Sequence, residues 1–266
     1  MENSKLGFIG AGHMASAIVR ILLDKNLMPP ENILMFDPDE ARLAVHTARG
    51  VRAAASNRAL VEESLLTILA VKPQVMEAVL TEVAPVSDGK NFLSIAAGLS
   101  THYLRARLDP SAHVVRVMPN TPLSLGFGAT VIARSEGLPK ELLHTAQDLF
   151  SAAGFVTVLD EDKLNEIIGV SSTSPAFFFR MADVMQRAAE AQGIDPDTAL
   201  TLIARTMEGS ARMLLTGRAP ETLVAEVASP GGTTQAALAV LDEADFDGAL
   251  HRAMLRCTER AYELSQ

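Results

Sequence analysis

Short apolar runs alternate with amphipathic stretches over the first 160 residues, and this alternation constrains the fold more than any other feature of the sequence. Within each amphipathic stretch the apolar residues recur at three- and four-residue intervals, which is typical of a helix packed on one face. We predict helices at 14–24, 39–48, 74–83 and 140–152. We predict strands at 6–9, 33–36, 65–71, 92–96, 114–118, 129–133 and 155–159. Because strands that alternate with helices form right-handed βαβ units, the sequence predicts a doubly wound α/β domain with a mostly parallel sheet.

The strand pattern ends with the seventh predicted strand, and the remaining sequence predicts only helices. Asp195 is a favourable N-cap residue, Pro196 suits a first helical turn, and Gly193 suits the end of the preceding helix. We therefore predict two domains, an α/β domain over 1–160 and an all-helical domain over 161–266.

The composition excludes several classes of function. The formal net charge is −9, and no run of Lys and Arg occurs, which argues against a nucleic-acid partner. Cys257 is the only cysteine, so no disulfide forms within the chain, and a reducing compartment suits it. The start of the chain lacks the long apolar region of a signal peptide, and no window is apolar over the ~18 residues that a membrane span needs. We expect a soluble, cytoplasmic protein with no membrane partner.

The predicted helix at 175–191 is apolar on more than one face. Its apolar residues are Phe177, Phe178, Phe179, Met181, Val184, Met185 and Ala188. A helix that is exposed to solvent on one side has polar residues along that side, so this composition indicates that the helix is buried on several sides. A subunit interface would provide that burial, and so would a central place in the core of one chain. The sequence leaves both open.

The segment Gly10–Ala15 follows the first predicted strand, opens the first predicted helix and matches the dinucleotide fingerprint G-x-G-x-x-(G/A). In this pattern Gly10 allows the tight turn, Gly12 lets the backbone approach a pyrophosphate, and Ala15 lets the helix pack close to the strand. Backbone N–H groups and the dipole at the helix start then face the phosphates. An ordinary glycine turn is the plain alternative, but the place between a strand and a helix favours a Rossmann-type nucleotide site.

Asp37 ends the second predicted strand, where dinucleotide-binding proteins place an acidic residue on the ribose 2′-hydroxyl of NAD. A carboxylate there would repel the 2′-phosphate of NADP. Arg42 follows closely and could pair with that phosphate instead. The alternative for Asp37–Asp39 is a turn and helix N-cap without a ligand. The sequence leaves NADH and NADPH open and slightly favours NADH.

Four segments together resemble the pyrroline-5-carboxylate reductase family, and they fit it over essentially the whole chain. They are Gly7–Ala15, Val71–Gln74, Met118–Pro122 and Ser229–Thr234. The first is widespread among dehydrogenases, whereas the other three are specific. The resemblance implies reduction of 1-pyrroline-5-carboxylate to L-proline by hydride transfer from NADPH or NADH, the last step of proline biosynthesis. It also implies an N-terminal Rossmann domain and a C-terminal helical domain that exchanges helices in a homodimer, often within a ring of dimers.

The resemblance implies a cofactor site assembled from several segments. The fingerprint contributes Gly10, Gly12, His13, Met14 and Ala15, and the end of the second strand contributes Asp37. Asn57 should lie near the ribose. The nicotinamide side of the groove should be lined by Val71, Lys72, Pro73, Ala97, Gly98 and Asn120. Most of these residues fall at the carboxyl ends of predicted strands, where open parallel sheets bind ligands. Lys72 could act as an acid, but its place before Pro73 equally suits a backbone contact with the side chain in solvent.

The turn Ser229–Thr234 is the predicted substrate site. Its two successive glycines expose backbone N–H groups at a helix start, which can receive a carboxylate without Arg or Lys. The residues implied to contact substrate are Ser229, Gly231, Gly232, Thr233 and Thr234. In the family the second threonine hydroxyl hydrogen-bonds the ring nitrogen, so Thr234 is the implied catalytic residue; a bound water could also relay the proton. An unliganded N-cap loop is the alternative.

The chain departs from the family at three positions. The family normally has Asn at the place of His13, and a partly charged imidazole there would make phosphate binding depend on pH. Ser172 and Ser174 replace two glycines of the family sequence Ser-Gly-Ser-Gly-Pro-Ala. Because serine resists positive φ and adds a side chain, the loop could shift or the pocket narrow, and another cyclic imine carboxylate becomes a candidate substrate.

Two other functions compete with this one. A β-hydroxyacid dehydrogenase has a catalytic lysine four residues after a glycine of its interdomain helix, but here Thr173 stands at that distance from Gly169. A non-catalytic NAD(P)-binding regulator would keep the fold and lose turnover. A metal site has little support because the six histidines are scattered. Three of them suit surface or structural places: His102, His113 and His144.

Overall fold

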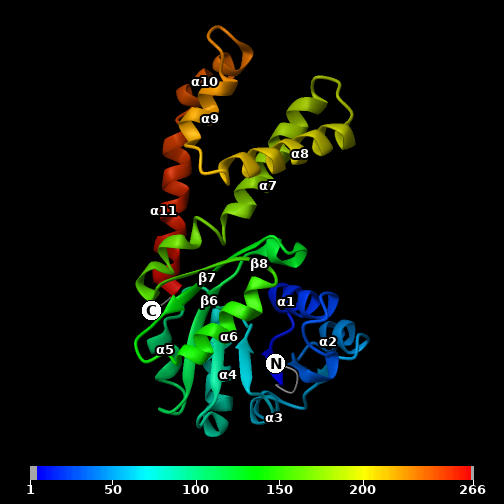
Figure 1. Cartoon of the computed structure of the whole chain (residues 1–266), viewed down its shortest axis with the longest axis vertical. Helices are drawn as coiled ribbons and strands as arrows, with labels where there is room; N and C mark the ends of the chain where they lie inside the picture. Colours follow the sequence, from blue (N-terminus) through cyan, green and yellow to red (C-terminus); the bar gives the residue numbers. More distant parts are fainter. Residues whose placement is uncertain (1–4, 265–266) are drawn as a thin grey trace. The chain divides into compact units, whose positions relative to one another are not determined.

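The computed structural model describes residues 5–264 and divides by contacts into two compact units (Figure 1). One unit contains the described residues through Thr173 together with those from Leu255 onward, and the other is Ser174–Met254. The helix Phe246–Leu264 therefore begins in one unit and ends in the other. A domain boundary after residue 160 remains a prediction.

The first unit is built on one eight-stranded sheet with the strand order β3-β2-β1-β4-β5-β6-β7-β8. Its strands are β1 (Leu6–Ile9), β2 (Ile33–Phe36), β3 (Arg52–Ala53), β4 (Leu66–Leu69), β5 (Asn91–Ser94), β6 (His113–Met118), β7 (Gly128–Arg134) and β8 (Gly154–Asp160). Neighbouring strands are parallel except β6 and β7, which are antiparallel. The predicted doubly wound, mostly parallel sheet is confirmed. The short, exposed β3 has no apolar run and escapes the sequence prediction.

Helices cover both faces of this sheet. They are α1 (His13–Asp24), α2 (Glu40–Thr47), α3 (Asn57–Glu63), α4 (Pro73–Val83), α5 (Thr101–Arg105) and α6 (Lys140–Ser151). Successive strand residues point to opposite faces, so Phe8 of β1 packs in the core that holds α1 and α6, and Ile9 packs in the core that holds α3 and α4. Both faces are therefore buried, which explains why most of the strands read as continuous apolar runs.

A buried ion pair anchors the chain where the sheet ends. The Arg116 side chain on β6 is 4% exposed and donates to Glu161 Oε1 at 3.1 Å. The same oxygen accepts the backbone N–H of Thr101 at 2.6 Å. Burial lowers the pKa of the Arg116 guanidinium, and Glu161 opposes that shift. Because a buried charge without a partner is strongly destabilising, this contact fixes the segment that follows β8.

The second unit is helical throughout. Its helices are α7 (Ser174–Glu190), α8 (Pro196–Leu214), α9 (Pro220–Val227), α10 (Thr233–Glu243) and the first part of α11 (Phe246–Leu264). Asp195 accepts the N–H of Thr198 at 2.9 Å as the N-cap of α8, and Gly193 has a φ of +84° after the end of α7. The predicted helix start at Asp195 and the predicted helix end at Gly193 are therefore confirmed.

The apolar side chains of α7 are exposed within the single chain. Pro175 is its one buried residue, whereas Phe178 is 51% exposed and Phe179 is 67% exposed. A central core position for this helix is therefore wrong, and burial against another molecule is the alternative that remains. Among residues 5–264, no helix combines the length and hydropathy needed to cross a bilayer.

Candidate functional site

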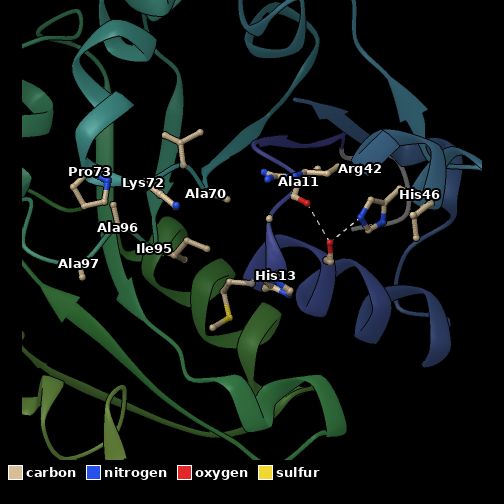
Figure 2. A pocket seen from close by; sticks show the side chains of 15 residues that line it. Ala11, His13, Arg42, His46, Ala70, Lys72, Pro73, Ile95, Ala96 and Ala97 are labelled. Atoms are coloured by element: carbon tan, nitrogen blue, oxygen red, sulfur yellow. Dashed lines mark hydrogen bonds between the residues drawn. The ribbon is translucent and has the colours of Figure 1, made fainter. Parts of the chain in front are cut away.

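A pocket with a volume of about 570 Å³ opens beyond the carboxyl ends of β1, β4 and β5 (Figure 2). It is lined by Ala11, Gly12, His13, Met14, Ser16, Arg42, Val45, His46, Ala70, Val71, Lys72, Pro73, Ile95, Ala96 and Ala97. In the sheet β1 lies between β2 and β4, so the strand order reverses beside β1. Ligands of open α/β sheets bind at such a switch point.

The two fingerprint glycines are required for different reasons. Gly10 has a φ of +100°, and a Cβ added there would lie 2.8 Å from the carbonyl oxygen of Ala70. The protein backbone itself therefore demands glycine at this position. At Gly12 an added Cβ would meet no protein atom within 4 Å, and φ is an ordinary −73°. No residue within 5–264 requires glycine there, whereas the close approach of a pyrophosphate would, so the turn fits a dinucleotide.

The glycine turn is held in place by Asp37. One carboxylate oxygen accepts the backbone N–H of Ala11 at 2.8 Å, and the other accepts the N–H of Asp39 at 2.9 Å. The residue is 8% exposed, so it lies behind the turn and not on the pocket wall. This contact ties the end of β2 to the start of α1, and no side chain among the described residues caps the N-terminus of this helix. The N–H groups at the start of α1 are thereby available to an anion.

Basic side chains lie at both ends of the pocket. Figure 2 shows Arg42 and His46 on the side of Ala11, and Lys72 on the side of Pro73. His46 Nε2 is 2.9 Å from the hydroxyl of Ser16, and burial, together with the nearby Arg49, lowers the pKa of this imidazole. The lining thus contains two cationic side chains, Arg42 and Lys72, and Arg42 already pairs with Asp39 Oδ2 at 3.1 Å.

The pocket brings together about half of the residues predicted to bind the cofactor. These are Gly12, His13, Met14, Val71, Lys72, Pro73 and Ala97. Lys72 is the N-cap of α4, Pro73 is its first residue, and the Lys72 side chain is exposed. Gly10, Ala15 and Asp37 lie directly behind this wall, since Gly10 turns the chain, Ala15 is 1% exposed and Asp37 holds the turn.

Three other predicted cofactor residues have partners within the protein and do not line the pocket. The amide of Asn57 donates to Glu82 at 2.7 Å, and its Oδ1 is buried with no hydrogen-bond partner among the described residues. Asn120 donates to the carbonyl of Ser171 at 3.1 Å and accepts the N–H of Ala129 at 2.9 Å. Gly98 has a φ of +81°, and a Cβ there would lie 2.9 Å from the carbonyl oxygen of Ala261 in α11.

Several lining residues are absent from the sequence prediction: Ala11, Ser16, Val45, His46, Ala70, Ile95 and Ala96. One signal could have found His46, because it stands four residues after Arg42 and therefore shares its helix face. The Ala and Ile residues are neighbours of predicted positions at strand ends. Alanine and isoleucine side chains have no polar or charged group, so the sequence alone does not identify them as ligand-binding residues.

The predicted substrate turn lies in the second unit and opens α10. Gly231 has a φ of +72°, and its N–H donates to the side chain of Gln235 at 2.7 Å. The N–H of Gly232 donates to the carbonyl of Ser229 at 3.0 Å. No side chain caps the helix, so N–H groups at its start are open to a carboxylate. Thr234 is half-buried and Thr233 is exposed.

The two serines that replace family glycines do not impose unusual backbone geometry. Among the described residues, the non-glycine positions with positive φ are Asn26 and Asp245, so Ser172 and Ser174 adopt ordinary conformations. The hydroxyl of Ser172 is buried with no hydrogen-bond partner among residues 5–264. The loop therefore accommodates serine without strain in φ, at the cost of one unsatisfied polar group.

The remaining histidines and acids do not form a metal site. Within the described part of the chain, no group of three His, Cys, Asp or Glu side chains could hold an ion. His102 and His144 are exposed, and His113 is half-buried on β6. These positions agree with surface or structural roles.

Two family models match the chain. Residues 161–264 match the model for pyrroline-5-carboxylate reductase dimerisation, and residues 5–98 match the model for NADP oxidoreductase, coenzyme F420-dependent. A pyrroline-5-carboxylate reductase from Methanosarcina acetivorans is 38% identical over 100% of both chains. The helical region is thus of a kind that associates, in line with the exposed apolar face of α7.

Solved structures agree with the sequence relatives. A pyrroline-5-carboxylate reductase from Coxiella burnetii is 31% identical and covers 100% of both chains with a TM-score of 0.87. A pyrroline carboxylate reductase from Plasmodium falciparum, solved with NADP bound, is 25% identical and covers 100% of both chains with a TM-score of 0.92. With a glycine turn shaped for a dinucleotide and relatives matched from end to end, the chain belongs to the pyrroline-5-carboxylate reductase family.

Proposed function

We propose that this chain reduces 1-pyrroline-5-carboxylate to L-proline with NADH or NADPH, as the last step of proline biosynthesis. The observation that carries the proposal is similarity over the full length of reductases with this activity in their names, at up to 38% identity among those compared. The open space beside Gly12 supports the cofactor half of the proposal independently of the similarity.

The cofactor is held along the pocket at the carboxyl edge of the sheet. The N–H groups of Gly12, His13 and Met14 receive the pyrophosphate, with Gly10 and Ala15 shaping the turn. Val71, Lys72, Pro73 and Ala97 line the nicotinamide side, while Asp37 serves the ribose end. Three further residues do not contact the cofactor directly but support the pocket wall through their contacts within the protein: Asn57, Gly98 and Asn120.

The nicotinamide supplies a hydride to the imine carbon, and the ring nitrogen gains a proton. The protein holds the reacting carbons in contact and excludes water, and such orientation contributes several kcal/mol, roughly 7 or more in favourable cases. The turn from Ser229 to Thr234, with Gly231, Gly232 and Thr233 at its centre, receives the carboxylate at the start of α10. Because the N–H groups of Gly231 and Gly232 already donate within the turn, the N–H groups from Thr233 onward bind the carboxylate. The Thr234 hydroxyl hydrogen-bonds the ring nitrogen.

The exposed apolar face of α7 supports association through the helical region. We extend this to a homodimer with exchanged C-terminal helices, within a larger ring of dimers, and to a boundary between a Rossmann domain over 1–160 and a helical domain over 161–266. A cytoplasmic location fits the single cysteine.

The test is steady-state oxidation of NADH and NADPH with 1-pyrroline-5-carboxylate and with its six-membered ring homologue. Turnover that is faster with the five-membered ring supports the proposal. A preference for the six-membered ring would point to another cyclic imine carboxylate as the substrate. Tight cofactor binding without turnover on either ring would instead identify a regulatory protein.

A further inference from the structure

The wall of the pocket beyond β5 is made of apolar side chains. Ile95, Ala96 and Ala97 follow this strand and line the pocket (Figure 2). None of the three side chains can form a hydrogen bond, so the backbone of the loop at residues 95–100 determines where the wall lies. The loop ends at Thr101, the first residue of α5. The contacts that hold its two ends therefore control the shape of the wall.

The start of the loop is held by the neighbouring strand ends. The N–H of Ile95 donates to the carbonyl of Leu69 at 3.2 Å, and the N–H of Ala96 donates to the hydroxyl of Ser94 at 3.3 Å. Both distances are long for hydrogen bonds from a backbone N–H. They fix the first two residues of the wall, whereas Ala97 lies beyond them.

The far end of the loop is held by a side chain from a distant part of the sequence. Glu161 follows β8, and its Oε1 accepts the N–H of Thr101 at 2.6 Å. This distance is shorter than either contact at the start of the loop. Ser100 accepts the N–H of Tyr103 at 3.0 Å, a contact that caps α5 without joining it to the sheet. Glu161 therefore ties the end of the loop to the last strand of the sheet.

Arg116 fixes the position of the Glu161 carboxylate. Its Nη1 lies 3.1 Å from the same Oε1, and its Nη2 donates to Asn165 Oδ1 at 3.5 Å. The Glu161 side chain is 23% exposed and the Arg116 side chain is buried, so solvent screens the pair only weakly. In the sheet Arg116 stands opposite Ser94, the residue before the loop. The ion pair thus connects the strand beside the start of the loop to the end of the loop.

We propose that Glu161 is a positioning residue, which holds the 95–100 loop through Thr101 and thereby places the nicotinamide of the bound cofactor. This inference rests on the proposed function, because it requires a dinucleotide in the pocket with its nicotinamide on the side of Ala97. Glu161 does not line the pocket, so it acts through the loop and not by contact with the cofactor. Small shifts of such a wall matter, since a misplacement of about 1 Å can lower a rate about 100-fold.

The test compares the dissociation constants of NADH and ADP-ribose for the full chain, measured by isothermal titration calorimetry. ADP-ribose has the adenosine and the diphosphate but lacks the nicotinamide, so the ratio of the two constants reports the nicotinamide alone. The unmodified protein should bind NADH about tenfold or more tightly than ADP-ribose. Glu161→Ala should weaken NADH binding about tenfold and ADP-ribose binding less than about twofold. Glu161→Gln keeps an oxygen that can accept the N–H of Thr101, so it should weaken NADH binding only about threefold.

A second substitution separates positioning from stability. Proline suits the first position of a helix, and Ser100 has a φ of −73° and a ψ of 157°, a conformation that a following proline permits. Thr101→Pro therefore removes the N–H that Glu161 accepts and leaves the ion pair with Arg116 in place. Glu161→Ala instead leaves Arg116 buried without its charged partner and should lower the Tm. The two variants should share the loss of NADH affinity, although their Tm values differ.

Asp160→Ala is the matched control. Asp160 precedes Glu161 directly, but it pairs with Arg134 at 3.4 Å on the exposed edge of the sheet. Its substitution removes one carboxylate from the same turn without a contact to the 95–100 loop. The ratio of the two dissociation constants should therefore stay as in the unmodified protein.

Unchanged NADH affinity in Thr101→Pro would overturn the inference, and so would an equal loss of affinity for NADH and ADP-ribose. Equal affinity of the unmodified protein for the two ligands would also overturn it, since the nicotinamide would then gain nothing from the wall. Turnover of 1-pyrroline-5-carboxylate is measured in parallel, and kcat should fall from the unmodified protein to Glu161→Gln and further to Glu161→Ala. Turnover with an unchanged affinity ratio in all variants would refute only the role of Glu161. The expected ratios without turnover would refute the proposed reaction and leave that role in place.

Discussion

Two glycine-opened helix starts in this chain, one before α1 and one before α10, present uncapped N–H groups in different surroundings. The first is fixed by distant parts of the sheet, because Gly10 packs against Ala70 and Asp37 bonds the turn from the end of β2. The second is held by near neighbours in sequence, Ser229 and Gln235, and its flanks are largely exposed.

The turn before α1 therefore depends on residues distant in the sequence, whereas the turn before α10 depends on its sequence neighbours. Around the first turn, the pocket is already walled by three strand ends and α2. Around the second, Gly231 has no protein atom near an added Cβ, so the described unit leaves its outer side open. We therefore expect a substitution that disturbs the packing of the first turn, as at Gly10, to affect stability strongly, and substitutions of the second turn to affect stability less.

Gly10→Ala should have the largest effect. The new methyl would force a φ of +100° on an L-residue and press against the Ala70 carbonyl at 2.8 Å. We expect a loss of about 3 kcal/mol in the free energy of unfolding, together with loss of cofactor binding. Urea denaturation measures the first and fluorescence titration the second. A loss below about 1 kcal/mol would show that the backbone around Gly10 relaxes to accommodate the methyl group.

Gly12→Ala is the matched test within the same turn. Because the new Cβ meets no protein atom within 4 Å and φ is compatible with alanine, the free energy of unfolding should change by less than about 1 kcal/mol. The methyl would stand where the pyrophosphate approaches, so NADH and NADPH should bind about tenfold or more weakly. Unaltered binding of both cofactors would mean that the phosphates do not approach this turn.

Thr234→Ala should lower the rate of the reaction at the second turn and leave cofactor binding at the first turn unchanged. Loss of the hydroxyl that contacts the ring nitrogen should lower kcat about tenfold or more, while cofactor affinity stays nearly constant. Thr234→Ser keeps a hydroxyl and should recover much of the rate. Equal losses in kcat and cofactor affinity would show that Thr234 is misassigned.

The sequence predicts most of the strands to within one or two residues, because strands buried on both faces leave runs such as Val114–Met118. It misses α3 and α5, which are too short to show a full helical period. The glycine turn follows from its motif between a strand and a helix. The anchoring of Asp37 to Ala11 does not, because a hydrogen bond between residues 26 apart in the chain depends on strand order.

The same limit applies to residues identified by resemblance. Asn120 and Gly98 match the family pattern, yet their contacts with Ala129 and Ala261 are visible only once the chain is folded. His46 was missed for the converse reason. Its i+4 relation to Arg42 is local, but a lone histidine on a helix has no distinctive pattern until burial and Ser16 are known.

Gly231→Ala should have a moderate effect on stability, in keeping with the open surroundings of the second turn. The residue has a φ of +72° but no close neighbours, so the expected loss is about 1 kcal/mol, from backbone strain alone. Gly209→Ala, in the interior of α8 with equally open surroundings, should instead stabilise by about 0.5–1 kcal/mol. A loss at Gly231 as large as that at Gly10 would remove the distinction between the two turns.

The smallest effect should come from His46, which forms part of the wall beside the first turn. Burial and Arg49 lower the pKa of this imidazole below its ordinary 6.5, so the unfolded chain binds a proton that the folded protein resists. Its contribution to stability is complete above pH 6.5 and is lost as the pH falls below that value. The free energy of unfolding, measured by urea denaturation between pH 7.5 and about 5, should therefore fall less steeply in His46→Gln than in the unmodified protein. A pH slope that His46→Gln leaves unchanged would mean that the pocket wall admits water freely around this side chain.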